Sequence, residues 1–512
     1  MKGHQYALGQ NPVPIGAVLI VFLSIACCAV SAADSQPNTS DPGPIAIEHV
    51  TVLPMIAGGP RILRDATVIL RNGRIESVAA VSPGKHAPIT EIPHDARRIN
   101  GVGKWLMPAL VDCHVHVEND RLLGLILHSP SIPDGTVNTA DILLPYVANG
   151  VLQIMNMSSM AESLKQRSEV ESGRTIGPHM ALAAMVDGAP PIWPVGMTRV
   201  ATTPEEGRQA VRDIKAEGFD YVKTYSRLDL DTFTAIVAEA NHEHMKALGH
   251  IPGRGEGMTA KYLQPGFAMV AHAEEFAYQS RSMSDADISE LVQLAKQAGV
   301  WLTATLTVDE RILEQVRNPQ SLRTRTEIRY VSPGTRAFWL DANPYLHAPL
   351  AQFAGLEGLI DFNRRLVKAF VLAGIPVVAG TDSLVPGVVP GFALHDEMAA
   401  LARAGLTNEQ VLVAATRLPA QWLGVATDRG TVEAGKTADL LLLNADPLAN
   451  VDNARNIAAV IAGGQYLSRS DLDAKMAALA ARNAAFPLIH AGGVAAKPGG
   501  SFLGEDSLNH DE

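Results

Sequence analysis

Aromatic residues and positive charge are both scarce in this chain of 512 residues. Phe, Trp and Tyr make up 5% of it, so the sequence offers no obvious platform for stacking nucleic-acid bases. The formal net charge is −11, and no patch rich in Lys and Arg is present. Because nucleic-acid binding depends largely on basic surfaces, this composition argues against a nucleic-acid partner.

Long apolar runs are also rare, and the longest stands near the N-terminus at residues 15–30. Lys2 precedes it, and Ser31-Ala32-Ala33 follows, which fits the small-x-small rule for signal cleavage. We therefore predict a signal peptide over residues 1–33 and an exported protein, periplasmic or secreted. The run is short for a spanning helix of about 20 apolar residues, so we expect no stable membrane anchor after cleavage. An uncleaved anchor is the alternative.

Cysteine is the third deficit, with three residues in the chain. Cys27 and Cys28 lie in the predicted signal peptide, which leaves Cys113 as the one thiol of the mature protein. An intramolecular disulfide is therefore excluded, and an exported protein of this composition must derive its stability from a large core.

The rest of the chain divides by its pattern of apolar residues and turn signals. After a linker at residues 34–44, short β-like pieces at 45–104 form a small module that a β segment at 426–468 completes. Between them, residues 105–425 alternate strand, loop and helix, as a (β/α)8 TIM barrel does. A helix at 469–490 and a disordered tail at 491–512 follow. The eight barrel strands are predicted at residues 106–111, 151–155, 180–184, 221–224, 247–249, 269–271, 301–304 and 376–379.

His114 and His116 follow the apolar run that we predict as the first barrel strand. Residues two apart on a strand share a face, so the two imidazoles can hold one divalent cation. The pair alone does not identify a metal site, because a purely structural pair of histidines has the same spacing. His242 and His244 have the same spacing, but they follow an amphipathic helix, where residues two apart lie on different faces.

Four later strand ends carry further candidate ligands. In a (β/α)8 barrel the catalytic residues stand at the C-terminal ends of the strands, so these side chains should meet the histidine pair. Each also has an ordinary structural interpretation, but together they give one metal-competent group at each of five strand ends. The four residues are Lys223, His250, His272 and Asp382.

With these residues in place, the sequence resembles the amidohydrolase superfamily, in its imidazolonepropionase-like and prolidase-like branch. The resemblance rests on residues 107–116, 374–382, 394–398, 415–420 and 435–440, and it spans most of residues 45–465. It implies a barrel with a small β-sandwich domain built from both chain ends. It also implies a binuclear site for two divalent metal ions, most typically Zn²⁺.

The resemblance assigns a role to each ligand. His114, His116 and Asp382 would bind the more buried ion, and His250 and His272 the second. Lys223 would bridge both as an N6-carboxylated lysine. A hydroxide between the ions would be the nucleophile, and Asp382 the catalytic residue that moves its proton to the leaving amine.

The same pattern implies hydrolysis of an amide or peptide C–N bond rather than deamination. Deaminases of the superfamily place a Glu shortly after the strand-five histidine, whereas Ile251 and Pro252 follow His250 here. The expected substrate is a dipeptide or N-acyl amino acid. A lactonase or esterase on the same site is the alternative, and a non-catalytic binding protein is a remote one.

Several residues near these strand ends have open interpretations. Tyr225 lies two residues after Lys223 and is the best candidate for a substrate contact, with barrel-rim packing as its alternative. Glu274 and Glu275 orient ligands or are solvated. His395 supports the site or lies on a helix surface. The arginine-rich segment 318–343 holds a substrate carboxylate or is a solvated basic loop. A homo-oligomer is left open.

Overall fold

A computed structural model of the chain describes residues 43–80, 91–127, 136–253, 258–346 and 349–486. The predicted signal peptide, most of the predicted linker and the predicted tail at 491–512 lie outside these ranges. Among the helices that the structure describes, none combines the length and the apolar character needed to cross a membrane.

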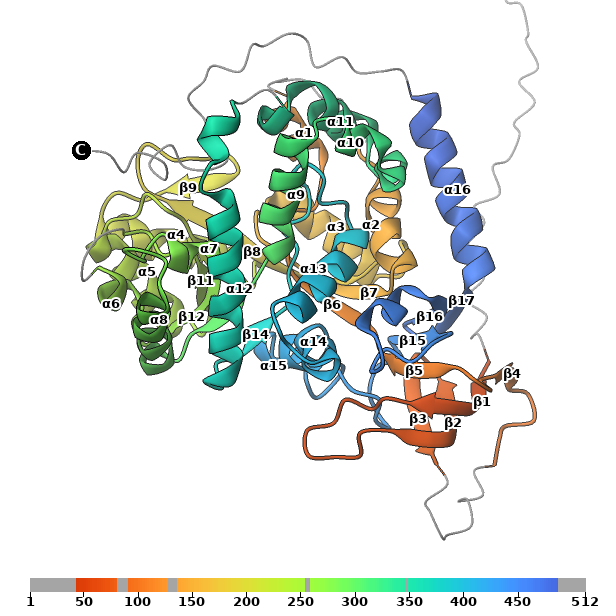
Figure 1. Cartoon of the computed structure of the whole chain (residues 1–512). Helices are drawn as coiled ribbons and strands as arrows, with labels where there is room; N and C mark the ends of the chain where they lie inside the picture. The colour runs from red at the N-terminus through yellow and green to blue at the C-terminus, as the bar shows by residue number, and fades with distance from the viewer. Residues whose placement is uncertain (1–42, 81–90, 128–135, 254–257, 347–348, 487–512) are drawn as a thin grey trace, which may run out of the picture. The chain divides into compact units, whose positions relative to one another are not determined.

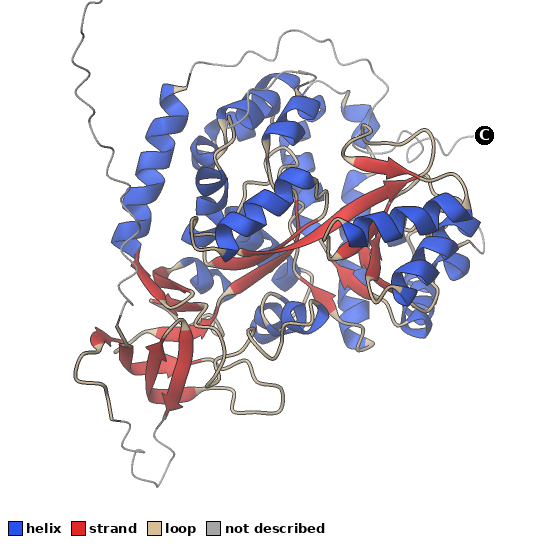
Figure 2. Cartoon of the chain, turned by 180° about the vertical axis from the view of Figure 1, so that it is seen from behind, coloured by secondary structure: helices blue, strands red, loops and turns tan. Residues whose placement is uncertain are grey.

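Eight parallel strands form the predicted barrel, in the sheet order β6-β7-β8-β10-β11-β12-β13-β14. Figures 1 and 2 show strands of this sheet from the two sides, with helices around them. Their side chains are mostly apolar and are buried on both faces, as expected of strands covered by helices outside and packed against one another inside. A short strand, β9, pairs with β8 outside this order. The bounds are β6 Leu110–Val115, β7 Val151–Asn156, β8 His179–Asp187, β9 Thr198–Val200, β10 Tyr221–Thr224, β11 Lys246–Gly249, β12 Phe267–Ala271, β13 Trp301–Thr303 and β14 Val377–Val378.

Backbone hydrogen bonds join the first barrel strand to the segment that follows the eighth. Cys113 N–H donates to Ala379 O at 3.0 Å, and His116 N–H donates to Ser383 O at 3.2 Å. Asp382 N–H donates to His114 O at 2.7 Å. This closure brings the ends of strands one and eight together, so residues far apart in the sequence become neighbours.

Helices cover the outside of the barrel and follow most of its strands (Figure 1). Short helical pieces occupy the segment between α9 and α12. The longer helices are α1 Asp120–Ile126, α2 Thr139–Ala148, α3 Ala161–Glu171, α4 Pro204–Ala216, α5 Leu230–His242, α8 Asp285–Ala298, α9 Leu306–Arg317, α12 Leu356–Leu372, α13 Phe392–Arg403, α14 Asn408–Ala414, α15 Arg417–Trp422 and α16 Arg469–Ala485. The short ones are α6 Thr259–Tyr262, α7 Glu274–Ala277, α10 Ser321–Thr324, η1 Thr326–Tyr330, α11 Pro333–Ala337, η2 Phe338–Ala342, η3 Pro344–Leu346, η4 Leu350–Phe353 and η5 Val451–Arg455.

A second sheet contains strands from both ends of the chain, as predicted for the accessory domain. It is one mixed sheet in the order β17-β16-β15-β5-β1-β2-β3, with β4 paired to β1. β15 pairs antiparallel with β5, which joins the C-terminal strands to the N-terminal ones (blue and orange in Figure 1). These strands bury a small apolar core of their own. They are β1 Ile45–Val52, β2 Leu63–Arg71, β3 Arg74–Ala79, β4 Arg97–Asn100, β5 Trp105–Pro108, β15 Leu440–Leu443, β16 Ile457–Ala462 and β17 Gln465–Ser468.

The apolar run predicted as the first barrel strand is two strands in different sheets. β5 ends at Pro108, and β6 begins at Leu110. Between them Ala109 N–H donates to Asp439 O in the second sheet, while Leu110 N–H donates to Gly150 O in the barrel. The chain therefore changes sheets at Ala109. The prediction of a single strand over 106–111 was wrong, because a continuous apolar run carries no sign of such a change.

Gly150 packs against the second sheet and offers a test of this junction. Its φ is +78°, and a Cβ there would lie 2.6 Å from Leu441 Cδ2 in β15. We expect Gly150→Ala to lower the free energy of unfolding by about 1–3 kcal/mol, because the added carbon meets both strain and overpacking. Gly103 has a φ of +73° and open space around it, so Gly103→Ala isolates the backbone strain. If urea denaturation shows that Gly150→Ala and Gly103→Ala lower the free energy of unfolding equally, the contact with Leu441 contributes nothing.

Candidate metal centre

Three predicted ligands meet where the first and eighth strands join. His114 lies in β6, His116 follows its last residue, and Asp382 follows β14. Oδ1 of Asp382 lies 3.2 Å from Nε2 of His114 and 2.8 Å from Nε2 of His116. The ligand atoms of the three side chains all lie within 4.8 Å of one another. Two imidazoles and a carboxylate at this spacing form a suitable donor set for one divalent ion.

The protonation states at this point suit metal binding. Burial lowers the pKa of His114 to about 3, so its imidazole is neutral and has a lone pair to donate. Burial raises the pKa of Asp382, but the nearby His114 and His116 outweigh it and hold that pKa well below its usual range. The backbone of Asp382 has a φ of +57°, which is strained for a residue with a side chain. The hydrogen bond from Asp382 N–H to His114 O helps to hold this conformation in place.

Lys223 lies in β10 and is 1% exposed. Its Nζ lies 3.4 Å from Nε2 of His114. The amine therefore lies against the group formed by His114, His116 and Asp382. Burial lowers the pKa of Lys223 to about 8. A buried ammonium is unfavourable without an anionic partner, and the nearby charges of Asp382 and Glu275 offset its burial only in part. The neutral amine is therefore more accessible here than in an ordinary lysine, and a modification that removes the positive charge is favoured.

His250 and His272 complete the set from the fifth and sixth strands. Their ring centroids lie 5.1 Å apart, and the rings of His272 and His114 lie 4.4 Å apart. Nε2 of His250 is buried and has no hydrogen-bond partner in the described part of the chain. A buried imidazole nitrogen without a partner is unfavourable unless it receives a ligand, so His250 fits a metal site.

Oxygen atoms hold three of the histidines by their other ring nitrogen. Nδ1 of His116 contacts Ser158 Oγ at 2.8 Å, and Nδ1 of His272 contacts Thr305 Oγ1 at 2.9 Å. Nδ1 of His250 contacts Ser226 Oγ at 2.8 Å and Glu275 Oε1 at 3.0 Å. Histidines that bind metals are oriented in this way, with the other nitrogen left for the metal. The residues that hold these histidines are Ser158, Ser226, Glu275 and Thr305.

The structure thus brings all six predicted ligands to one end of the barrel. Their division between two ions, with His114, His116 and Asp382 at one and His250 and His272 at the other, stays a prediction, since the ring of His272 lies as close to His114 as to His250. Lys223 lies on the fourth barrel strand, after the strand of His114 and before the strand that leads to His250, and its amine contacts His114. Nitrogen and carboxylate donors of this kind fit two divalent ions. That these residues bind metal stays a prediction.

Tyr225 also lies at this end. Its ring packs against that of His250 with centroids 4.1 Å apart, and its hydroxyl accepts a hydrogen bond from Trp193 Nε1 at 2.8 Å. The hydroxyl keeps its own proton, which it can donate to an oxygen of a bound molecule. The position of Tyr225 is therefore compatible both with packing at the barrel rim and with a substrate contact. Trp193, in the loop after β8, helps to orient the Tyr225 side chain.

The structure separates the two adjacent glutamates. Glu275 is 4% exposed and contacts His250, so it orients a ligand rather than being solvated. Its other oxygen accepts from the backbone N–H of Ile251 at 2.9 Å. Glu274 makes no such contact with a histidine. His395 is buried, and its Nε2 bonds to Asn149 O at 2.9 Å, away from the ligands.

Sequence reasoning missed three of the four residues that hold the ligands, and only Glu275 was among its candidates. Ser158, Ser226 and Thr305 each stand two positions beyond a strand end, and that placement is the signal that could have found them. The hydrogen bond between Trp193 and Tyr225 could not be predicted, because it depends on two loops packing together.

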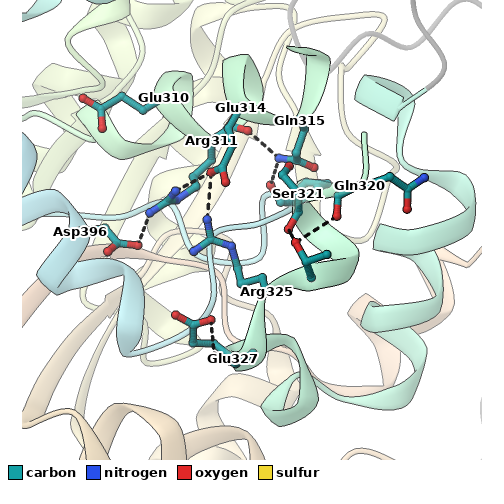
Figure 3. A network of polar contacts seen from close by, with 12 residues as sticks. Glu310, Arg311, Glu314, Gln315, Gln320, Ser321, Arg325, Glu327 and Asp396 are labelled. Atoms are coloured by element: carbon teal, nitrogen blue, oxygen red, sulfur yellow. Dashed lines mark hydrogen bonds and ion pairs between the residues drawn. The ribbon is translucent and has the colours of Figure 1, made fainter. Parts of the chain in front are cut away.

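The arginine-rich segment 318–343 consists largely of short helical pieces, and two of its arginines bind other parts of the chain (Figure 3 shows Arg325). Arg325 donates to Glu314 at 2.9 Å, and Glu314 also pairs with Arg311. Arg311 in turn reaches Asp396 of α13 at 2.6 Å. Arg336 donates to the backbone oxygen of Asn483 in α16 at 3.0 Å. These arginines tie helices together rather than facing the metal centre.

The second histidine pair does not form a site. α5 ends at His242, so His244 lies beyond the helix. Glu239, His242 and Glu243 lie close enough to hold an ion, but Glu239 already pairs with Arg212 at 3.0 Å. Glu243 pairs with Lys215 at 2.6 Å. The cluster is a surface ion-pair network.

A (β/α)8 barrel with these side chains at its C-terminal strand ends defines the class as a metal-dependent hydrolase. The Amidohydrolase family model matches residues 105–467, and the chain belongs to that family.

Relatives in sequence and solved structures of similar fold are all of low sequence identity to this chain. Imidazolonepropionases of Aromatoleum aromaticum and Rhizobium rhizogenes are 24% and 23% identical, over 76% and 77% of this chain and 88% and 90% of theirs. A bottromycin amidohydrolase has a similar fold, with a TM-score of 0.66 and 19% identity over 87% of this chain and 91% of its own. A Xaa-Pro dipeptidase with bound methionine in its active site has a TM-score of 0.60 and 17% identity, over 83% of this chain and 100% of its own.

Proposed function

We propose that this protein is an exported hydrolase that cleaves the amide or peptide C–N bond of a dipeptide or N-acyl amino acid. The observation that carries the proposal is the meeting of Lys223 with His114, His116, His250, His272 and Asp382 at one end of the barrel. A buried lysine among four histidines suits a binuclear site better than a mononuclear one. A similar structure is a prolidase complexed with N-methylphosphonate-L-proline, which supports a small amino-acid-like substrate.

Two divalent ions, zinc in the first instance, would be held by these six residues, with Lys223 in its carboxylated form between them. When bound, they lower the pKa of water to give a nucleophile and polarise the scissile carbonyl. The carbamate forms when the neutral amine of Lys223 attacks CO2 and loses a proton. Its charge is then −1, with two oxygens for the two ions.

Asp382 is the residue that would move the proton. Its carboxylate is ionised and lies against His114 and His116, so it can accept a proton from the attacking water. It then delivers that proton to the nitrogen of the departing amine, which completes C–N cleavage.

Tyr225 would contact the substrate. Its hydroxyl proton is free to bond to a carbonyl or carboxylate oxygen, while Trp193 fixes the position of the oxygen. Because the Tyr225 ring packs on His250, the contact would lie beside the second ion.

Export would follow from the signal peptide at residues 1–33. Fractionation of cells that express the full chain tests it, with N-terminal sequencing of the mature protein. A start near residue 33 or 34 in the exported fraction is the expected result, and full-length protein in the cytoplasm or membrane contradicts it.

A substrate panel on the metal-loaded enzyme tests the reaction. We expect dipeptides or N-acyl amino acids to be hydrolysed with kcat/KM above about 10⁴ M⁻¹ s⁻¹ for the best of them. The panel includes lactones and esters, because the same nucleophile attacks them. Faster turnover of a lactone than of every amide would replace this proposal with the esterase alternative. Fewer than one ion per chain after metal supplementation would reject the binuclear site.

A further inference from the structure

Thr305, the residue before α9, begins its helix in an unusual conformation. Its φ of +50° and ψ of +37° lie in the left-handed region, which a β-branched residue rarely adopts. Thr203 and Thr407 stand at the same position before α4 and α14, and both are extended. Each accepts a hydrogen bond from the backbone N–H three residues on, at 3.3 and 3.2 Å. In the described part of the chain, the Thr305 side chain makes no such bond to its own helix.

The hydroxyl of Thr305 serves the metal centre instead. It lies 2.9 Å from Nδ1 of His272, and Thr305 is 4% exposed. An N-cap side chain reaches back to its own helix from an extended backbone, so the left-handed conformation separates the hydroxyl from α9. The first N–H groups of a helix have no acceptor within it. Holding His272 therefore leaves the start of α9 without the cap that a threonine ordinarily provides.

A glutamate from another helix supplies the missing acceptor. Glu397 lies in α13, which packs beside α9 (Figure 1), and it is 0% exposed. Its Oε2 accepts from the N–H of Thr307, the second residue of α9, at 2.8 Å. The next N–H, that of Val308, donates to Thr305 O at 3.2 Å. Both N–H groups that an N-cap side chain would serve therefore have acceptors already.

We propose that Glu397 is a positioning residue for His272 and that it acts through Thr305. Two conformations compete at Thr305: an ordinary extended N-cap with its hydroxyl on α9, and the observed left-handed one with its hydroxyl on His272. By accepting from Thr307 N–H, Glu397 removes the hydrogen bond that the ordinary conformation would gain. The proposal rests on the proposed function, because it concerns a ligand of the second ion.

Zinc affinity of the metal-free full chain, measured by competition with a chelator, tests the proposal. Glu397→Met has a similar length but no acceptor, and we expect it to raise the Kd of one of two ions by about 10- to 100-fold. Thr305→Val should do the same. Glu397→Gln keeps an oxygen for the N–H of Thr307, so both ions should bind as in the wild type. Thr407→Val is the matched control: it removes the cap of α14 and should leave both affinities unchanged.

The combined variant shows whether the two residues act through one contact. Glu397→Met together with Thr305→Val should weaken zinc binding no more than Thr305→Val alone, because the second change has nothing left to remove. Effects that multiply would overturn the proposal. Unchanged zinc binding by Glu397→Met would also overturn it and would leave the proposed function in place. If Glu397→Met does not fold, Glu397→Asp replaces it with the same expectation, since its carboxyl group is one carbon further from Thr307.

Failure of the metal centre itself gives a different result. Fewer than one zinc ion per wild-type chain rejects the binuclear site, and the proposal is then decided by crystal structures of the metal-free variants. A Thr305 hydroxyl that leaves His272 for the N–H of Thr307 in Glu397→Met, but not in Glu397→Gln, supports the proposal. A hydroxyl that stays on His272 in both variants overturns it.

Discussion

Asp382→Asn lowers kcat by about 10²- to 10⁴-fold, the usual contribution of a positioned acid–base group. Asparagine has the same shape and keeps one oxygen against His114 and His116, but it cannot accept the proton of the attacking water. The loss should therefore appear in kcat more than in KM. Steady-state kinetics on the best substrate of the panel, with metal content measured on the same sample, gives the answer.

Asp439→Asn is the matched control for this variant. Asp439 is 8% exposed and its carboxylate lies 3.1 Å from Nε2 of the partly exposed His179, so it is a second Asp–His contact, remote from the ligands. We expect it to keep kcat within about threefold while lowering stability by about 1–3 kcal/mol. A kcat for Asp382→Asn within tenfold of wild type, with metal retained, would show that another group moves the proton.

The barrel and its ligands could be predicted because their signals are local. Each strand is a short apolar run, and parallel strands place their C-terminal ends on one side of the barrel. His250 and His272 end such runs, so their convergence follows from topology alone. The resemblance then supplied their division between two ions.

The rest depends on contacts between distant segments. The change of sheet at Ala109 requires Asp439 and Gly150 as partners, some 330 and 41 residues away in the chain. Glu274 and Glu275 are adjacent and identical, yet Glu275 contacts His250 and Glu274 contacts no described histidine. Only the short helix α7 decides which of them faces the metal centre, and no pattern in the sequence distinguishes them.

Lys223 gives the second large effect, because it is the proposed bridge between the two ions. We expect Lys223→Met to lose at least one of two bound ions and to lower kcat by 10²-fold or more, since methionine has a similar length but no metal-binding anion. Metal analysis and kinetics measure both effects. Lys246→Met is the matched control: Lys246 lies on the neighbouring strand β11 with its amine 4.5 Å from the Trp422 ring centre, and it should keep both ions.

The carboxylated form of Lys223 can be detected directly. Only a neutral amine attacks CO2, and a pKa of about 8 leaves roughly one tenth of the Lys223 amines neutral at pH 7, against well under one in a thousand for an ordinary lysine. We expect metal-free enzyme to regain activity with zinc faster as bicarbonate is added, and ¹³C-labelled CO2 to give a carbamate resonance that Lys223→Met lacks. Full activity in CO2-free buffer without that resonance would mean that the unmodified amine stands between the histidines. The site would then need another anion, and the position of Lys223 beside His114 would contribute a proton donor rather than a bridge.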